Sequence, residues 1–157
     1  MSKKIKISVV GIGLMGQQHI KAINKSKLCV LHSIVEIKKY ESKLVKKLRV
    51  PVYDNIEYLI KNKPDAVIVA TPNNLHEKHT IKFLKSKIPV LLEKPISDKI
   101  TSAKKIIKAA KITRTPLLIG YHRRHNSIVN VVKTVIKSGK LGRIVSANIL
   151  FWIYKHK

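Results

Sequence analysis

The chain has 157 residues, 45% of them hydrophobic and 26% charged, so it is long enough to enclose a core and too apolar to be disordered. Its single cysteine, Cys29, excludes an internal disulfide and is typical of a reducing compartment. The apolar stretch 7–20 lacks the cleavage site of a signal peptide and is too short and glycine-broken to cross a bilayer. We therefore expect a cytoplasmic protein with no membrane span.

The charge is extreme, with 33 basic residues against 8 acidic ones and a formal net charge of +25. Two interpretations stay open. Such a field attracts nucleic acid and other polyanions. However, 28 of the 33 basic residues are lysines scattered in runs of no more than two, and aromatic residues make up only 5%. We favour a compositional bias, accompanied by nonspecific polyanion binding at low salt.

The first predicted strand, 5–10, runs directly into Gly11-Ile12-Gly13-Leu14-Met15-Gly16, and a helix is predicted over 15–24. This G-x-G-x-x-G order predicts a turn that holds a dinucleotide pyrophosphate. Gly11 permits the tight turn, Gly13 lets the phosphates approach the main chain, and Gly16 lets the helix pack close to the strand. Met15, Ile20 and Ile23 are the expected buried side of that helix.

Glu36 lies twenty residues after Gly16, at the end of a second predicted strand over 28–35. A carboxylate at this place accepts the ribose hydroxyls of the adenosine half and repels a 2′-phosphate. The pattern therefore favours NAD as the cofactor. Lys38 and Lys39 follow closely and could accommodate a phosphate, which leaves NADP as an alternative. The alternative interpretation of Glu36 is a solvated glutamate at a strand end.

Apolar runs continue to alternate with helix-period segments, which predicts an α/β fold with a Rossmann-type doubly wound parallel sheet. Further strands are expected over 51–53, 66–70, 89–92 and 117–120, and helices over 40–48, 56–61, 75–86 and 101–112, the last capped by Thr101. Beyond them, Ser127 is expected to cap a helix that Gly139 ends, and the segment 143–154 predicts one strand.

Two loops at the carboxyl ends of predicted strands carry candidate chemistry. Thr71-Pro72-Asn73 follows the strand 66–70, at the edge where open α/β sheets bind ligands. Glu93-Lys94-Pro95 follows the strand 89–92, where a lysine can take the proton of a carbinol or polarise its oxygen if partial burial disfavours the charged form. Pro95 would hold the bend, with a cis Lys94–Pro95 bond as one form of it.

No metal site is predicted. His76 and His79 are three residues apart, as are His122 and His125, and this spacing can place two ligands on one helix face. No third ligand accompanies either pair, and a stable site needs one.

Five motifs, in this order and spacing, resemble the Gfo/Idh/MocA family of oxidoreductases: residues 11–16, 70–76, 93–95, 120–126 and 138–144. The resemblance implies that the chain contributes to hydride transfer between a nicotinamide cofactor and a sugar-like or polyol-like substrate. It places Gly11, Gly13, Leu14, Met15, Gly16, Glu36, Thr71, Pro72, Asn73, His76, Glu93 and Lys94 at the cofactor, with Lys94 also the catalytic residue beside the substrate. Arg123 and Arg124 fall close to the active-site cleft, where either could hold a substrate oxygen or a cofactor phosphate, with plain surface exposure as the alternative.

The resemblance also implies an NAD(P)-binding domain over 1–122 and, over 123–157, the start of a truncated second α/β domain for substrate binding and oligomerisation. The catalytic histidine of that second domain matches no residue here, so we predict that this chain alone is inactive. The implied partners are a homo-oligomer or a complementing chain that carries the second domain. Two other functions stay open: a non-catalytic nucleotide-binding module, such as a regulator or pseudogene product, and a basic nucleic-acid binder.

Overall fold

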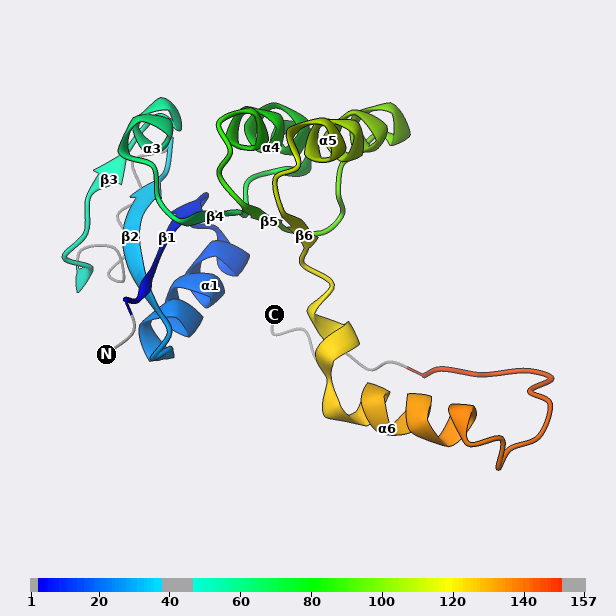
Figure 1. Ribbon diagram of the computed structural model, residues 1–157. Coiled ribbons are helices and arrows are strands. Elements are labelled where there is room, and N and C mark those ends of the chain that lie inside the picture. Colours follow the sequence, from blue (N-terminus) through cyan, green and yellow to red (C-terminus); the bar gives the residue numbers. More distant parts are fainter. Residues whose placement is uncertain (1–2, 38–46, 151–157) are drawn as a thin grey trace, which may run out of the picture. The chain divides into compact units, whose positions relative to one another are not determined.

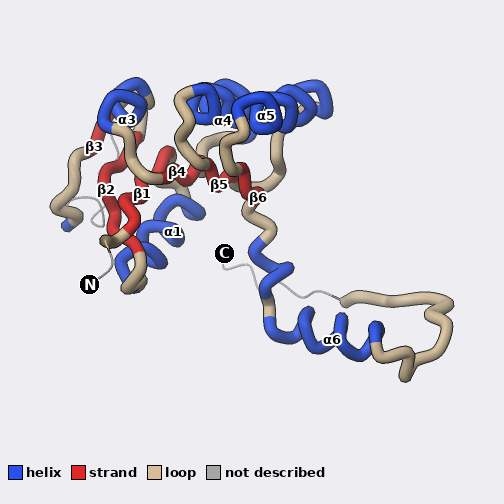
Figure 2. The backbone as a smooth tube through the Cα atoms, viewed as in Figure 1, coloured by secondary structure: helices blue, strands red, loops and turns tan. Residues whose placement is uncertain are grey.

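A computed structural model describes residues 3–37 and 47–150 of the chain (Figures 1 and 2). Its centre is a parallel sheet of six strands in the order β3-β2-β1-β4-β5-β6. The strands are β1 (Ile5–Val10), β2 (Cys29–Val35), β3 (Val52–Tyr53), β4 (Ala66–Val69), β5 (Val90–Leu92) and β6 (Leu117–Ile119). The predicted Rossmann-type doubly wound sheet is thus confirmed, and its strand order reverses between β1 and β4.

Helices cover both faces of this sheet (Figure 1). One face carries α1 (Leu14–Lys25), and the other carries α3 (Glu57–Asn62), α4 (His76–Lys85) and α5 (Ile100–Thr113). The helix predicted over 40–48 falls mostly on residues 38–46, which lie outside the described residues. No helix in the described ranges is long and apolar enough to cross a membrane.

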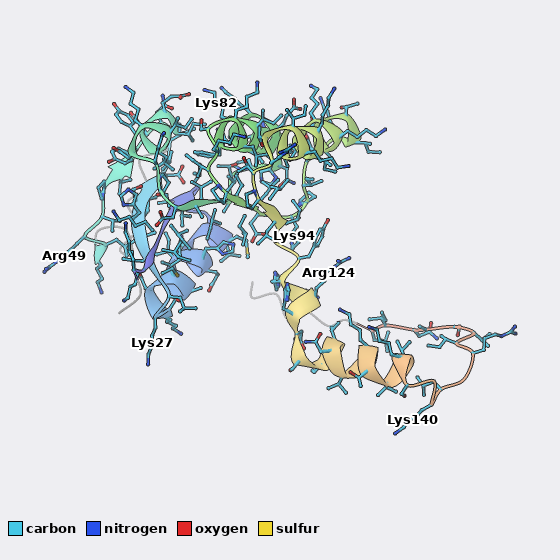
Figure 3. The ribbon with its side chains drawn as sticks, viewed as in Figure 1. Lys27, Arg49, Lys82, Lys94, Arg124 and Lys140 are labelled. Carbon is cyan, nitrogen blue, oxygen red and sulfur yellow. The ribbon has the colours of Figure 1, made fainter. Side chains whose placement is uncertain are left out.

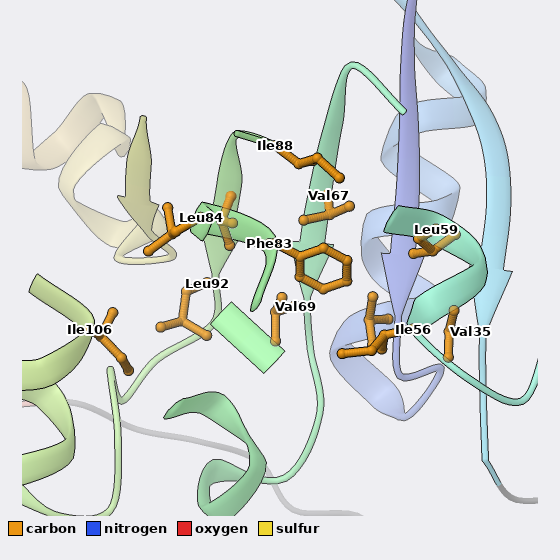
Figure 4. Packing of buried hydrophobic residues seen from close by; sticks show 12 residues of the cluster. Val35, Ile56, Leu59, Val67, Val69, Phe83, Leu84, Ile88, Leu92 and Ile106 are labelled. Carbon is orange, nitrogen blue, oxygen red and sulfur yellow. The ribbon is translucent and has the colours of Figure 1, made fainter. Parts of the chain in front are cut away.

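β4 and β5 are apolar along their length because both of their faces are buried. Successive side chains of β1 enter different clusters: Val9 packs with Ile20 and Ile23 of α1, whereas Val10 packs with Phe83 of α4. Figure 4 shows Phe83 in the middle of this second cluster, whose strand and helix side chains come from both halves of the sheet. The two clusters fix the sheet between its helical layers and hold the carboxyl ends of β1, β2 and β4 in place.

Two predicted helix caps are wrong by one or two residues. The cap of α6 (Ser127–Lys137) is Asn126, whose Oδ1 accepts a hydrogen bond of 2.8 Å from the Ile128 N–H. Asn caps a helix as well as Ser does, and its extended backbone places the side chain over the first turn. At α5 the cap is Lys99, which makes no side-chain cap hydrogen bond, so Thr101 lies inside the helix. Gly139, with φ +71°, follows the last turn of α6 as expected.

The chain divides into an N-terminal unit, residues 1–120, and a C-terminal unit, residues 121–157. The strand predicted over 143–154 does not form within its described part, since residues 143–150 contain neither strand nor helix. A strand needs a hydrogen-bonded neighbour, and the described residues of the C-terminal unit supply none. Residues 151–154 lie outside the described ranges.

Candidate functional site

The three glycines of the turn after β1 meet different geometric demands. Gly11 has φ +87°, and a Cβ there would lie 2.7 Å from the Ala70 carbonyl oxygen. At Gly16, a Cβ would lie only 1.9 Å from the carbonyl oxygen of Gly11, because α1 packs directly on the turn. A Cβ on Gly13 would meet no atom within 4 Å. The turn, the close helix approach and the open backbone that the motif predicts are all present.

Glu36 ties the end of β2 to this turn. Its Oε2 accepts a hydrogen bond of 2.9 Å from the Ile12 N–H. The contact follows from the parallel register, in which Val10 of β1 lies beside Val35 of β2, so that both strands end at the same level. The carboxylate is half-buried and stands at the edge of the sheet where the glycine turn opens.

A cavity of about 650 Å³ opens at the carboxyl ends of β1, β2 and β4, where the strand order reverses. Open α/β sheets bind ligands at this switch point. The lining residues come from the glycine turn, the end of β2 and the segment after β4: Val10, Gly11, Gly13, Leu14, Met15, Val35, Glu36, Ile37, Ala70, Thr71, Pro72, Leu75 and His79.

The segment after β4 contributes to the cavity in part. Thr71 and Pro72 line it, whereas Asn73 is exposed and begins a short 3-10 turn outside the lining. The Thr71 hydroxyl is buried and has no hydrogen-bond partner among residues 3–37 and 47–150.

His76 is fully buried and holds two loops together instead of lining the cavity. Its Nε2 lies 2.9 Å from the Thr71 carbonyl oxygen, and its Nδ1 lies 2.9 Å from the Pro95 carbonyl oxygen. The imidazole therefore joins the segment after β4 to the segment after β5. A residue at this position fixes the spacing of the two loops that carry the candidate chemistry.

Glu93, at the end of β5, is a buried carboxylate with defined partners. Its Oε1 lies 2.7 Å from Nε2 of His19 on α1, and its Oε2 accepts a hydrogen bond of 3.2 Å from the Lys94 N–H. A Cβ on Gly120 would lie 3.0 Å from the same Oε1, so the glycine after β6 leaves space for this carboxylate. These contacts hold Glu93 in one orientation beside Lys94.

Lys94 itself is exposed, so the expected partial burial of its side chain is absent (Figure 3). The Lys94–Pro95 peptide bond is cis, which the sequence analysis gave as one possible form of this bend. Figure 3 also shows Arg124, which belongs to the C-terminal unit. Both Arg123 and Arg124 are exposed, and the Arg124 guanidinium lies 5.9 Å from the centre of the Tyr121 ring. A substrate role for either arginine stays a prediction.

Two histidines, His19 and His79, were not predicted as site residues; the sequence singled out His79 only as half of a rejected metal pair. His19 follows Gly16 by one helical turn, beside the buried Ile20, and this placement on the sheet-facing side of α1 was the available signal. His79 occupies the buried face of α4 and lines the cavity. Burial, and next the positive charge of Lys78, hold the pKa of His79 below its ordinary value. No group of three potential metal ligands occurs in the described ranges.

A parallel sheet with a glycine turn after β1, an acidic residue after β2 and a cavity at the switch point defines a dinucleotide-binding Rossmann protein. Residues 5–121 match a family model described as an oxidoreductase family with an NAD-binding Rossmann fold. The chain belongs to this family, the Gfo/Idh/MocA oxidoreductases, which confirms the resemblance seen in its motifs.

Curated relatives include the inositol 2-dehydrogenase of Rhodococcus erythropolis, 31% identical over 147 residues, which cover 90% of this chain and 42% of the relative. Another is the glucose-6-phosphate 3-dehydrogenase of Bacillus subtilis, 28% identical over 147 residues, with 93% and 42% covered. The chain thus spans less than half the length of these relatives.

Among solved structures, scyllo-inositol dehydrogenase from Lactobacillus casei superposes with a TM-score of 0.83 at 25% identity, over 89% of this chain and 43% of that one. The WlbA dehydrogenase from Bordetella pertussis, crystallised with NADH and UDP-GlcNAcA, superposes with a TM-score of 0.83 at 24% identity, over 90% and 44%. The second comparison supports the fold alone.

Proposed function

We propose that this chain binds NAD in the cavity at the switch point and forms the cofactor-binding part of an oxidoreductase that acts on a sugar-type or polyol-type carbinol. The observation that carries the proposal is the convergence of the glycine turn and Glu36 on one cavity of about 650 Å³. This volume is in the range of cofactor sites. The substrate class comes from the names of the relatives, inositol and glucose-6-phosphate dehydrogenases.

The residues present fit the cofactor. Gly13 leaves its backbone open toward the cavity, so the phosphates can approach the first N–H groups of α1. The Thr71 hydroxyl is buried beside the cavity without a partner in the described residues, and a rotation of this side chain would bring it to a polar group of a bound dinucleotide. Glu36 brings a carboxylate to the ribose position, which favours NAD over a cofactor with a 2′-phosphate.

The reaction would rest on the segment after β5, Glu93-Lys94-Pro95, and on the two histidines, His19 and His76, that hold it. A nicotinamide cofactor, when bound, would supply the acceptor or the donor of the hydride. Lys94 is the proposed catalytic residue, which takes the hydroxyl proton of the carbinol as the hydride leaves and returns it in the reverse direction. Glu93, held by His19, positions the loop that carries Lys94. His76 sets the distance between this loop and the cavity wall at Thr71.

We further propose that turnover needs additional protein, supplied by further chain or by a partner. Acid–base work at a lysine near neutral pH requires that water be largely excluded around it. Lys94 is exposed, so the described residues do not provide that exclusion. We expect cofactor binding without turnover from these residues alone.

The test is a fluorescence titration of the purified chain with NADH and NADPH, alongside duplex DNA at the same moderate salt. We expect saturable NADH binding that Gly13→Val abolishes, because the added side chain occupies the cavity. Ala22→Val, on the exposed side of α1, is the matched control and should bind NADH as tightly as the native chain does. Glu36→Gln should narrow the preference for NADH over NADPH. Binding of DNA alone, or NADH binding indifferent to Gly13→Val, would refute the proposal.

A further inference from the structure

The imidazole of His79 lines the proposed cofactor site, is buried, and has no role in that site so far. Its side chain is only 5% exposed, and its Nδ1 has no hydrogen-bond partner among residues 3–37 and 47–150. Buried polar atoms are nearly always partnered, so an exception calls for a ligand or another explanation. Burial and the neighbouring Lys78 favour the neutral ring by holding the pKa of His79 low. A neutral imidazole carries one donor and one acceptor.

His79 lies between two cavities. It lines the large one with the glycine turn and Glu36, and also a second cavity of about 290 Å³ between α4 and the residues that precede and begin α3. The second cavity is lined by Val35, Ile37, Asp54, Asn55, Ile56, Glu57, Lys78, His79 and Lys82. Val35, Ile37 and His79 are common to both. His79 and the end of β2 therefore line the same space, where the two cavities meet.

The order of groups in a dinucleotide indicates what would occupy this space. The pyrophosphate binds at the glycine turn and the adenosine ribose at the acidic residue after β2. The base is attached to that ribose, so it extends beyond Glu36 toward Ile37. Ile37 is the next residue, and it shares both cavities with His79.

The chemistry of adenine matches this surrounding. Its two faces are apolar, as are Val35 and Ile37, while one edge presents the N6 amine as donor and the N1 nitrogen as acceptor. The neutral imidazole can accept from the first or donate to the second. A rotation of the ring would bring the unpartnered Nδ1, which is buried in this structure, to the base and give it a hydrogen-bond partner.

We propose that His79 binds the amine-bearing edge of adenine and makes cofactor affinity depend on the identity of the base. This inference rests on the proposed NAD site and adds a specificity-determining residue to it. The structural alternative, a histidine that only fills space on α4, predicts no dependence on the base.

The test compares NAD with its 1,N6-etheno derivative, in which a bridge removes both the amine N–H groups and the N1 acceptor. We expect the native chain to bind NAD more tightly than the derivative by about three- to tenfold, the worth of one neutral hydrogen bond. In His79→Phe, which keeps an aromatic ring without nitrogen, this ratio should fall to near one. His79→Gln should restore part of the ratio. His32→Phe, on β2 outside both cavities, is the matched control and should keep it.

The outcomes separate the two proposals. If the native chain binds neither compound, the NAD site and the inference both fail. If NAD binds and His79→Phe leaves the ratio unchanged, or weakens both compounds equally, only the inference fails. Should His79→Phe not fold, the ring NMR signals of His79 in the native chain decide the question. They should move on addition of ADP-ribose and stay in place with nicotinamide mononucleotide, and an unchanged spectrum with ADP-ribose would overturn the inference.

Discussion

Gly16 and Gly13 belong to one motif, yet the structure predicts very different losses of stability when a methyl group is added to each. A Cβ on Gly16 would lie 1.9 Å from the Gly11 carbonyl oxygen, about 1.5 Å closer than an ordinary contact at 3.4 Å. The Cβ position is fixed by the backbone of α1 and the oxygen belongs to the backbone of the turn. Neither atom can rotate away, so α1 would have to move away from the turn. Overpacking of this kind costs about 3 kcal/mol or more. Alanine returns about 1 kcal/mol of helix propensity, which leaves Gly16→Ala destabilised by at least about 2 kcal/mol.

Gly13→Ala should instead change the free energy of unfolding by no more than about 1 kcal/mol, because its Cβ meets no atom within 4 Å. Thermal and urea unfolding followed by circular dichroism measure both variants. We expect Tm to fall by about 5–10 °C for Gly16→Ala and by a few degrees at most for Gly13→Ala. The same Gly13→Ala protein should bind NADH more weakly, since the methyl group enters the cavity. Equal stabilities for the two variants would refute the packing geometry on which this reasoning depends.

Three further outcomes follow from packing, capping and titration. Phe83→Ala should lower the free energy of unfolding by about 3–5 kcal/mol in urea titrations, because the ring is fully buried in the cluster of Figure 4. The control is Leu118→Ala: Leu118 is 67% exposed, so its loss should lower the free energy of unfolding by no more than about 0.5 kcal/mol. Asn126→Ala removes the cap of α6 and should cost that helix about 1 kcal/mol, read from faster amide hydrogen exchange over Ser127–Lys137 with unchanged protection in β1. The pKa of His79 in the folded chain lies below its ordinary value of 6.5. As the pH falls below 6.5, the unfolded chain therefore takes up a proton at this residue that the folded chain does not. The free energy of unfolding should decrease as a result. The urea midpoint should therefore fall less between about pH 7 and pH 5 in His79→Gln than in the native chain, and equal losses would show that other groups dominate.

The parts of the molecule that the sequence predicts are those decided within a few residues. The backbone at position 11 has a positive φ that few residues other than glycine adopt. The local sequence is therefore enough to predict the turn after β1. Val67, Ile68 and Val69 are apolar in succession because β4 is covered on both faces, and this pattern separates strands from the helices between them. Helix ends are harder, as at Asn126 and Lys99, because neighbouring residues compete for the cap.

The parts that the sequence does not predict depend on contacts between distant residues. His19 reaches Glu93 across 74 positions, and no local pattern indicates that a ring on α1 meets a carboxylate after β5. The same holds for His79, whose burial is visible only when α4 is placed on the sheet. The segment 143–150 has the composition of a strand, but pairing decides whether a strand forms, and the described residues offer it no neighbour.

Binding and turnover should therefore be separable properties of this chain. The proposed cofactor contacts come from the edges of β1, β2 and β4, which two buried clusters hold within the N-terminal unit. Lys94, the proposed catalytic residue, is in contrast exposed to solvent. Its neighbour Glu93 is buried and held by His19. A buried, oriented neighbour next to an exposed lysine is consistent with our proposal that turnover needs additional protein around Lys94. Saturable NADH binding with no oxidation of any polyol would support this division, and turnover by these residues alone would refute it.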